Sequence, residues 1–413
     1  MLPVACISVS SALGGSEWVL RDFAVRAREH GVEPLVILPK EGPLGERLRE
    51  DGLTLAVAPA REDFLELSQR ELSRSPETLL KFGRGLWAWS RAIAATLDEA
   101  AALPAGRPVV LYSNGFKAHL AAALLRGYRR VWHLHEFPPE RVGFVWRAVG
   151  AAVPEAAIAV SRSVAEAWRA PFLAPEVVLN GVDVERFRPS PRTWWLHDML
   201  DLPHDARLIG MPAVFARWKG HLQVVETFER IAAQLPDAHL VLVGGPIYDT
   251  VAERGYAQEL SQRVRRSSVG GKVAADSLSA RIHFVRFRDD PWRLYPEFDL
   301  VVHFSTRPEP FGRVILEAMA CGTPVIAADA GGPAEMVEDG VTGWLTPMGD
   351  RETLGRRMVA ALAADAPPLG AAARRAAESR FTAARFSAEV SGVLKRVAAS
   401  GATQPKEPAP PQS

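Results

Sequence analysis

The sequence predicts an α/β protein that contains two successive parallel β-sheets. Short apolar runs, typical of buried parallel strands, alternate with longer segments of helical periodicity. This alternation stops at the proline-rich segment 188–191 and then begins again. A chain of 413 residues is long enough for two or three domains, and the single restart favours two.

Strands are expected on both sides of that break. Before it they are Val4–Val9, Pro34–Leu38, Val109–Tyr112, Val131–Leu134 and Ala157–Val160. After it they are Leu208–Met211, His239–Val243, Ile282–Val285, Leu300–His303 and Pro324–Ala327. The predicted boundaries are an N-terminal domain over residues 1–185, a C-terminal domain over 186–382, a helix over 383–400 that can pack back on the N-terminal domain, and a disordered tail over 401–413.

Composition argues against several classes of protein. Lysine and arginine total 49 while aspartate and glutamate total 48, so a formal net charge of +1 offers no basic surface to nucleic-acid phosphates. The two cysteines, Cys6 and Cys321, are too few for a disulfide scaffold or a cysteine-based zinc site and fit a reducing compartment. No apolar run approaches the roughly 20 residues that span a bilayer, and the apolar start lacks the basic region of a secretory signal. The sequence therefore predicts a cytoplasmic protein.

The most informative loop follows the strand Leu300–His303. Two α/β domains form a cleft where the carboxyl ends of their strands meet, so functional residues are sought in such strand-to-helix loops. This loop ends at Gly312, where a helix is expected to begin. The backbone amides of Gly312, Arg313 and Val314, at the positive end of that helix, predict a seat for a phosphate group.

Two carboxylates, Glu309 and Glu317, flank the predicted phosphate seat. A carboxylate repels a phosphate, so we expect both to accept hydrogen bonds from neutral hydroxyls, of which sugar hydroxyls are the obvious candidates. Two glutamates at this spacing are also typical of a solvent-facing helix. The phosphate seat between them favours the functional interpretation.

A second loop, residues 210–221, carries two cations, Arg217 and Lys219, after the first strand of the C-terminal domain. Lys219 can meet a diphosphate as a point charge, and Arg217 offers a planar fork for bidentate contact. Both side chains are expected to point toward the cleft. The alternative is a basic pair on the protein surface.

Two segments of the N-terminal domain are also expected at the cleft. Gly14 and Gly15 lack the spacing of the dinucleotide fingerprint, which argues against a nicotinamide cofactor, but they allow a ligand to approach the backbone closely. A tight turn with Ser16 capping the next helix is the alternative. His133 and His135 share one face of a strand, yet no third metal ligand is evident nearby. A hydrogen bond from His135 to a sugar hydroxyl is therefore favoured over a metal site.

Together these segments resemble the retaining, nucleotide-sugar-dependent glycosyltransferases of the GT-B fold (family 4-like, group 1). The resemblance covers roughly residues 5–385, and the family signature of a glutamate, seven residues and a second glutamate is matched by Glu309 and Glu317. Further matches are the segments at 14–17, 135–136, 159–163, 178–189, 331–335 and 339–343. The resemblance implies two Rossmann-like domains whose parallel sheets face each other across a cleft, with the acceptor domain first and the donor domain second.

The sequence departs from the family at one position. The family usually has a glycine-arginine pair five residues before the lysine, whereas Ala213 and Val214 stand there in this chain. Arg217 or Arg313 can take over the contact that the missing arginine makes with the diphosphate. If neither does, donor binding weakens, because a charge-assisted hydrogen bond contributes about 1.5–3 kcal/mol.

The resemblance implies a hexosyltransferase that moves a sugar from a UDP- or GDP-sugar to an acceptor hydroxyl with retention at the anomeric carbon. Bacterial polysaccharide, glycolipid or glycoconjugate biosynthesis is the expected setting, and no metal or other cofactor is required. The implied catalytic residues are Glu309 and His135 at the donor sugar and Lys219 at the leaving diphosphate. The implied donor-binding residues are Arg217, Gly312, Arg313, Val314, Glu317, Gly14 and Gly15.

Two other functions stay open. A retaining glycosidase would use Glu309 and Glu317 as nucleophile and acid about 5–5.5 Å apart, but it has no use for Lys219. A non-catalytic nucleotide-sugar-binding protein is suggested by Val214.

The expected partners are a nucleotide-sugar donor and a sugar, lipid-linked or other small acceptor, without nucleic acid. The segment 81–91 mixes bases with aromatics, which allows peripheral contact with the inner face of a membrane, although a helix packed on the sheet is favoured.

Overall fold

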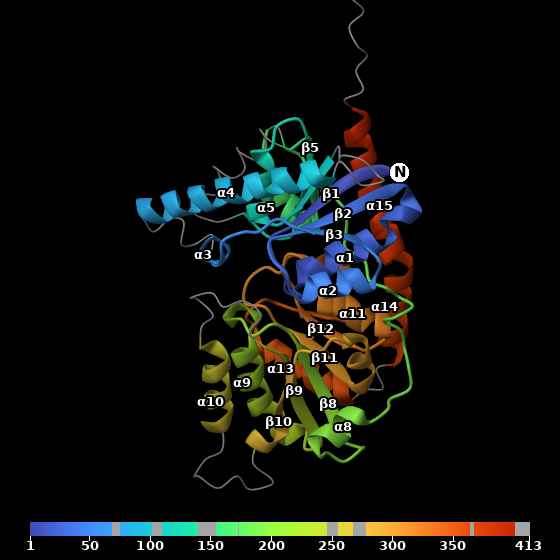
Figure 1. Cartoon of the computed structure of the whole chain (residues 1–413). Helices are drawn as coiled ribbons and strands as arrows, with labels where there is room; N and C mark the ends of the chain where they lie inside the picture. Colours follow the sequence, from blue (N-terminus) through green and yellow to red (C-terminus); the bar gives the residue numbers. More distant parts are fainter. Residues whose placement is uncertain are drawn as a thin grey trace, which may run out of the picture.

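The computed structural model describes residues 1–67, 75–100, 110–138, 154–171, 173–245, 255–266, 278–363 and 367–400. Figure 1 shows two α/β domains, with the N-terminal sheet and its helices in one half of the picture and the C-terminal sheet and its helices in the other. The prediction of an α/β protein with two parallel sheets is confirmed.

The N-terminal sheet is wholly parallel, with strand order β3-β2-β1-β4-β5-β6-β7. Its strands are β1 (Leu2–Ser8), β2 (Val32–Leu38), β3 (Thr54–Val57), β4 (Val110–Asn114), β5 (Arg129–Leu134), β6 (Ala156–Ala159) and β7 (Glu176–Val177). Its helices are α1 (Gly15–Ala27), α2 (Pro43–Glu50), α3 (Glu62–Leu65), α4 (Pro76–Ala100), α5 (Phe116–Ala123) and α7 (Arg162–Trp168). The strand order reverses between β1 and β4, so a crevice opens at their carboxyl ends.

The C-terminal sheet repeats this plan, with strand order β10-β9-β8-β11-β12-β13. Its strands are β8 (Arg207–Pro212), β9 (Ala238–Gly244), β10 (Ile282–Arg286), β11 (Leu300–His303), β12 (Val325–Ala328) and β13 (Trp344–Thr346). Its helices are α8 (Trp195–Leu200), α9 (His221–Ile231), α10 (Tyr256–Arg266), α11 (Arg313–Cys321), α12 (Pro333–Met336), α13 (Arg351–Ala363) and α14 (Pro367–Arg380). The reversal here lies between β8 and β11, the two strands whose loops carry the predicted cations and carboxylates.

Every expected strand is present to within a few residues, although Val109 lies outside the described residues. The strands β3, β7 and β13 were not predicted. They lie at or next to the sheet edges and span only two to four residues. Short edge strands bury little side-chain surface, so they lack the continuous apolar run by which a central parallel strand is recognised.

The final helix, α15 (Ala383–Ala399), packs on the N-terminal domain. Its residues Phe386, Val390 and Leu394 belong to the same apolar cluster as Cys6 of β1 and Phe23 of α1. Figure 1 shows this helix in red beside the N-terminal half of the chain. The domain boundaries at 185, 382 and 400 stay predictions, and the predicted tail over 401–413 lies outside the described residues.

One of the buried apolar clusters spans both domains. A single buried cluster includes Trp132 and Ala157 of the N-terminal sheet together with Val243, Phe311 and Ile315 of the C-terminal domain. Such packing fixes the edges of the two sheets relative to each other. Within the part of the chain that the structure describes, no helix is long and apolar enough to cross a membrane.

Candidate active site

A cavity of about 530 Å³ lies between the carboxyl ends of the two sheets. Its volume falls in the range of small-molecule sites. The N-terminal domain contributes the first turn of α1 and the residues after β5, and the C-terminal domain contributes the loops after β8 and β11 together with the start of α11. All the predicted site residues except Arg217 line this cavity.

Lys219 and Glu309 form an ion pair at the floor of the C-terminal side, with Lys219 Nζ 2.7 Å from Glu309 Oε2. The same carboxylate oxygen lies 3.0 Å from His303 Nε2 and 3.0 Å from Ser305 Oγ. Burial alone raises the pKa of Glu309, but the charge of Lys219 and the hydrogen bond with His303 outweigh it and hold that pKa well below its usual range. Glu309 is therefore a carboxylate at any working pH.

Gly220 explains how Lys219 reaches this position. Its φ is +81°, and a Cβ there would lie 2.0 Å from the carbonyl oxygen of Phe304. Only glycine allows the loop after β8 to lie directly against the end of β11. The backbone amide of Thr306 also donates to the carbonyl of Trp218 at 2.7 Å. The two loops are thus joined, and Lys219 is held beside Glu309.

The start of α11 matches the predicted phosphate seat. Gly312 is the residue before the helix, has a left-handed φ of +94° and provides no side-chain cap to the first turn. Gly312, Arg313 and Val314 all line the cavity. An uncapped helix start that faces a cavity offers backbone amides and the positive end of the helix dipole to an anion.

Glu317 is held by two side chains, one on each carboxylate oxygen. The hydroxyl of Tyr295 donates to Oε2 at 2.5 Å, and Nε of Arg313 donates to Oε1 at 2.8 Å. Burial raises the pKa of Glu317 and outweighs the lowering effects of these two partners. Each carboxylate oxygen can accept two hydrogen bonds, so Glu317 still has capacity for hydroxyls of a ligand.

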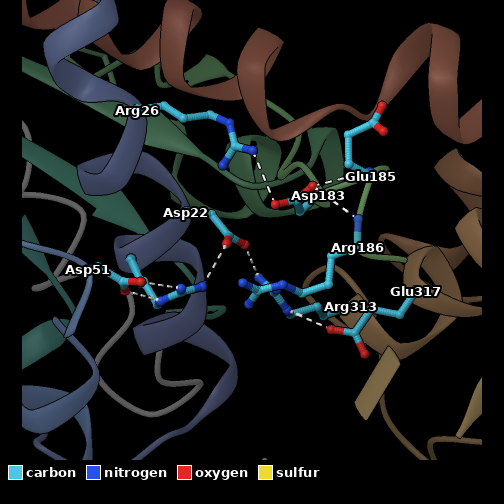
Figure 2. A network of polar contacts seen from close by, with 9 residues as sticks. Asp22, Arg26, Asp51, Asp183, Glu185, Arg186, Arg313 and Glu317 are labelled. Atoms are coloured by element: carbon cyan, nitrogen blue, oxygen red, sulfur yellow. Dashed lines mark hydrogen bonds and ion pairs between the residues drawn. The ribbon is translucent and has the colours of Figure 1, made fainter. Parts of the chain in front are cut away.

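Arg313 also links the two domains. Its Nη1 lies 2.7 Å from Oδ2 of Asp22 on α1, and Figure 2 shows Asp22 and Glu317 on either side of this guanidinium. The chain of charges continues inside the N-terminal domain, where Arg21 makes two hydrogen bonds of 2.5 and 2.7 Å to Asp51. Asp22 and Arg21 are buried, so the bridge between α1 and α11 is shielded from water.

The N-terminal wall of the cavity carries Gly14, Gly15, Glu17 and His135. Burial lowers the pKa of His135 to about 3, so its imidazole is neutral at neutral pH. Burial raises the pKa of Glu17 to about 7, against the opposing effects of the backbone amides of Glu17 and Gly14 and of the Ser16 hydroxyl. Glu17 and His135 therefore contribute hydrogen-bonding groups in place of strong charge.

The expectation that Arg217 points toward the cleft is wrong. Its Nη1 lies 2.5 Å from Oε2 of Glu259 on α10, and its guanidinium lies over the ring of Tyr256. Residues 217–219 form a 3-10 turn, in which successive side chains project about a third of a turn apart. The same turn that directs Lys219 into the cavity therefore directs Arg217 toward α10.

The position of the missing family arginine holds no cation. Val214 lines the cavity, so the family position is occupied by an apolar side chain there. Arg288 also lines it but is bound to Asp290 by two hydrogen bonds of 2.6 and 2.9 Å. Lys219 and Arg313 are the cations that contact the Glu309 and Glu317 carboxylates.

Sequence reasoning missed His303, Tyr295 and Asp22. His303 was assigned only to a buried strand, although its place at the carboxyl end of that strand was a signal for the site. Tyr295 and Asp22 carry no such signal. Tyr295 meets Glu317 through packing inside the C-terminal domain, and Asp22 meets Arg313 only through packing of the two domains. In the described ranges, no group of three or more metal-ligating side chains is arranged to hold a metal ion.

The geometry defines a class of protein, two Rossmann-like domains with a ligand cleft between them, which is the GT-B arrangement. The profile described as "Glycosyltransferase Family 4" matches residues 13–186, and the profile described as "Glycosyl transferases group 1" matches residues 196–380. The chain belongs to the group 1 glycosyltransferases of the GT-B fold.

Relatives and solved structures agree with this assignment. The D-inositol 3-phosphate glycosyltransferase of Mycobacterium avium is 35% identical over 211 residues, which are 50% of this chain and 45% of that protein. The matched part is thus less than half the length of that relative. The crystal structure of Anabaena HepE in complex with UDP-glucose has a TM-score of 0.76 at 25% identity and covers 96% of this chain and 100% of that one. A sucrose-phosphate synthase from Thermosynechococcus elongatus has a TM-score of 0.77 at 20% identity, over 97% of this chain and 100% of that one.

Proposed function

We propose that this chain is a retaining glycosyltransferase that moves a sugar from a UDP-sugar to an acceptor hydroxyl. The observation that supports this most is the pairing of two buried carboxylates with two cations around the open start of α11. Glu309 pairs with Lys219, and Glu317 pairs with Arg313. The HepE structure contains UDP-glucose, which favours UDP over the GDP that the family resemblance also allows.

The donor diphosphate is proposed to bind at the start of α11. An ammonium group has three donors, so Lys219 can contact a phosphate oxygen while it keeps its bond to Glu309. The amides at Gly312 and Val314 and the guanidinium of Arg313 supply further donors. Glu317 is proposed to accept hydrogen bonds from the ribose hydroxyls. These groups are already in place before the reaction, which is the condition under which electrostatic stabilisation of a leaving group is most effective.

The transfer breaks the bond between the anomeric carbon and the diphosphate and forms a bond between that carbon and the acceptor oxygen. The acceptor proton passes to the leaving phosphate, so no separate base is required. Glu309, ionised and buried, stabilises the positive charge that develops on the sugar ring. His135, neutral and on the opposite wall, contacts a sugar hydroxyl. Exclusion of water from the closed cleft protects the donor against hydrolysis.

Nucleotide-sugar binding gives the first test. A panel of UDP-glucose, UDP-N-acetylglucosamine and GDP-mannose is expected to show a rise in melting temperature with a UDP-sugar, because a ligand at 100 times its Kd stabilises the native state by about 2.7 kcal/mol. NMR of the product should then show the anomeric configuration of the donor. A protein that no nucleotide-sugar stabilises, or a product with inverted configuration, would contradict the proposal.

A non-catalytic nucleotide-sugar-binding protein is the second candidate, favoured by Val214 in the cavity wall at the place of the family arginine. For such a protein, calorimetry should show that UDP-glucose binds, and no UDP should be released when any acceptor is added. Release of UDP at a rate that depends on an added acceptor would exclude it.

We also propose that the protein is located in the cytoplasm. Contact with the inner face of a membrane is a separate prediction. The segment 81–91 lies in α4, where Phe82 and Trp89 are buried while Leu80 and Trp87 are exposed. The helix α4 thus buries one set of apolar side chains and exposes another, which a membrane surface can contact. Flotation with anionic liposomes tests the contact, and a protein that stays at the bottom of the gradient would exclude it.

A further inference from the structure

The N-terminal wall of the cavity contains buried polar atoms that have no hydrogen-bond partner among the described residues. They are Oε2 of Glu17, Nε2 of His135 and Oδ1 of Asn180. Glu17 is 2% exposed and Asn180 3% exposed, and all three residues line the cavity. A buried polar atom without a partner is costly. Such atoms on the wall of a cavity indicate that a ligand completes their hydrogen bonds.

These groups face the proposed donor seat from the opposite domain. Glu17 is in the first turn of α1, directly after β1, and Asn114 at the end of β4 donates to the carbonyl of Ser16 at 3.2 Å. His135 follows the end of β5. The strands β1, β4 and β5 are neighbours in the sheet, so their carboxyl ends present one continuous wall. The second substrate of a transfer reaction has to approach the donor from this side.

The charges on this wall do not suit an anionic ligand. Arg21, one helical turn after Glu17, is bound to Asp51 by two hydrogen bonds and lies 4.0 Å from Asp22. The carboxyl group of Glu17 itself lies in the first turn of α1, where the amides of Gly14 and Glu17 offset part of the rise in its pKa that burial causes. A phosphate at this helix start would meet that carboxyl group. A neutral hydroxyl, which can donate to Oε2, fits the site.

There is also room for a ligand beside Glu17. A Cβ added to Gly15 would meet no heavy atom within 4 Å, and Gly15 is exposed at the cavity wall. The backbone next to Glu17 is therefore open to the cavity, and a ring that carries hydroxyl groups can approach it.

We propose that Glu17 is an acceptor-binding residue, whose Oε2 accepts a hydrogen bond from a neutral hydroxyl of a sugar or cyclitol acceptor. The proposal rests on the proposed function, because it places the acceptor opposite a bound nucleotide-sugar. It goes further by naming a residue and a chemical class of acceptor. Burial raises the pKa of Glu17, and no cation among the described residues is paired with it, which agrees with a carboxyl group that binds a neutral hydroxyl.

The test uses saturation-transfer NMR on the full chain with UDP present and with D-glucose, D-galactose and myo-inositol as probes. The wild type is expected to give a signal with at least one probe. Glu17→Met should weaken that binding by about fivefold to tenfold, in line with the loss of one hydrogen bond. Glu17→Met removes a buried carboxyl group without changing the length of the side chain much, so it is expected to fold. Glu17→Gln, which keeps an acceptor oxygen, should restore most of the signal.

Calorimetry with UDP-glucose separates the two proposals. Wild type and Glu17→Met should bind it equally, because Glu17 is not among the groups proposed to hold the donor. Normal donor binding combined with no probe signal in the wild type, or with an unchanged signal in Glu17→Met, would overturn the role of Glu17 and leave the proposed function standing. A wild type that does not bind UDP-glucose would contradict the proposed function itself.

Discussion

Replacing Lys219 with alanine is expected to lower kcat/KM for sugar transfer by about 10²–10³, the cost of removing one preorganised donor to a developing negative charge. Lys219 is the cation that the loop after β8 places in the cavity, and its position is fixed by Gly220 against the end of β11. Its loss also leaves the buried carboxylate of Glu309 without its cation. Steady-state kinetics with UDP-glucose, following UDP release, measure the effect.

Arg217→Ala is the matched control for this prediction. The two cations are only two residues apart, but Arg217 is bound to Glu259 on the far side of the turn. We expect its removal to change kcat/KM by less than about twofold, because its side chain lies outside the cavity and its ion pair with Glu259 is exposed. Equal losses in Lys219→Ala and Arg217→Ala would show that general charge near the cleft matters, and would contradict the assignment of Lys219 to the diphosphate.

Replacing Arg313 with alanine is expected to lower the free energy of unfolding by about 3–5 kcal/mol, the usual cost of removing one partner from a buried ion pair. Burial by itself lowers the pKa of Arg313, but the carboxylates of Asp22 and Glu317 more than offset this and raise it above its usual range. Without this guanidinium, Asp22 and Glu317 lose their shared partner across the domain boundary (Figure 2). Urea denaturation measures the change.

Arg356→Ala provides the comparison. Arg356 and Glu352 form a pair with the same four-residue spacing on a helix as Arg313 and Glu317, but their side chains are 65% and 83% exposed. Exposed pairs of this kind contribute about 0.2–1 kcal/mol. Equal destabilisation by Arg313→Ala and Arg356→Ala would mean that the bridge between α1 and α11 does not stabilise the packing of the two domains. A role for Arg313 in holding the domains together would then be wrong.

The fold could be predicted because the central strands are recognisable as apolar runs in the sequence. Runs such as 208–211 and 300–302 contain no polar residue, since parallel strands are buried on both faces. The loops after these strands follow from the topology, so Lys219, Glu309 and Glu317 could be placed at the cleft from the sequence. The edge strands β7 and β13 have no comparable pattern, because they are short and partly exposed.

The direction of side chains could not be predicted in the same way. Spacing alone put Arg217 and Lys219 in one loop. The directions in which side chains project from a single 3-10 turn decide which of the two enters the cavity. Asp22 meets Arg313 only when α1 packs against α11, and Tyr295 meets Glu317 only when the segment before β11 packs there. Contacts of this kind depend on the assembled core, and no local pattern encodes them.

The position of the donor is the central claim, and a crystal structure of the protein with UDP tests it most directly. We expect the β-phosphate oxygens within hydrogen-bond distance of Lys219 Nζ and the backbone amides of Arg313 and Val314, with the ribose hydroxyls at Glu317 and nothing at Arg217. A diphosphate bound away from Lys219 and the start of α11, or at Arg217, would contradict the account.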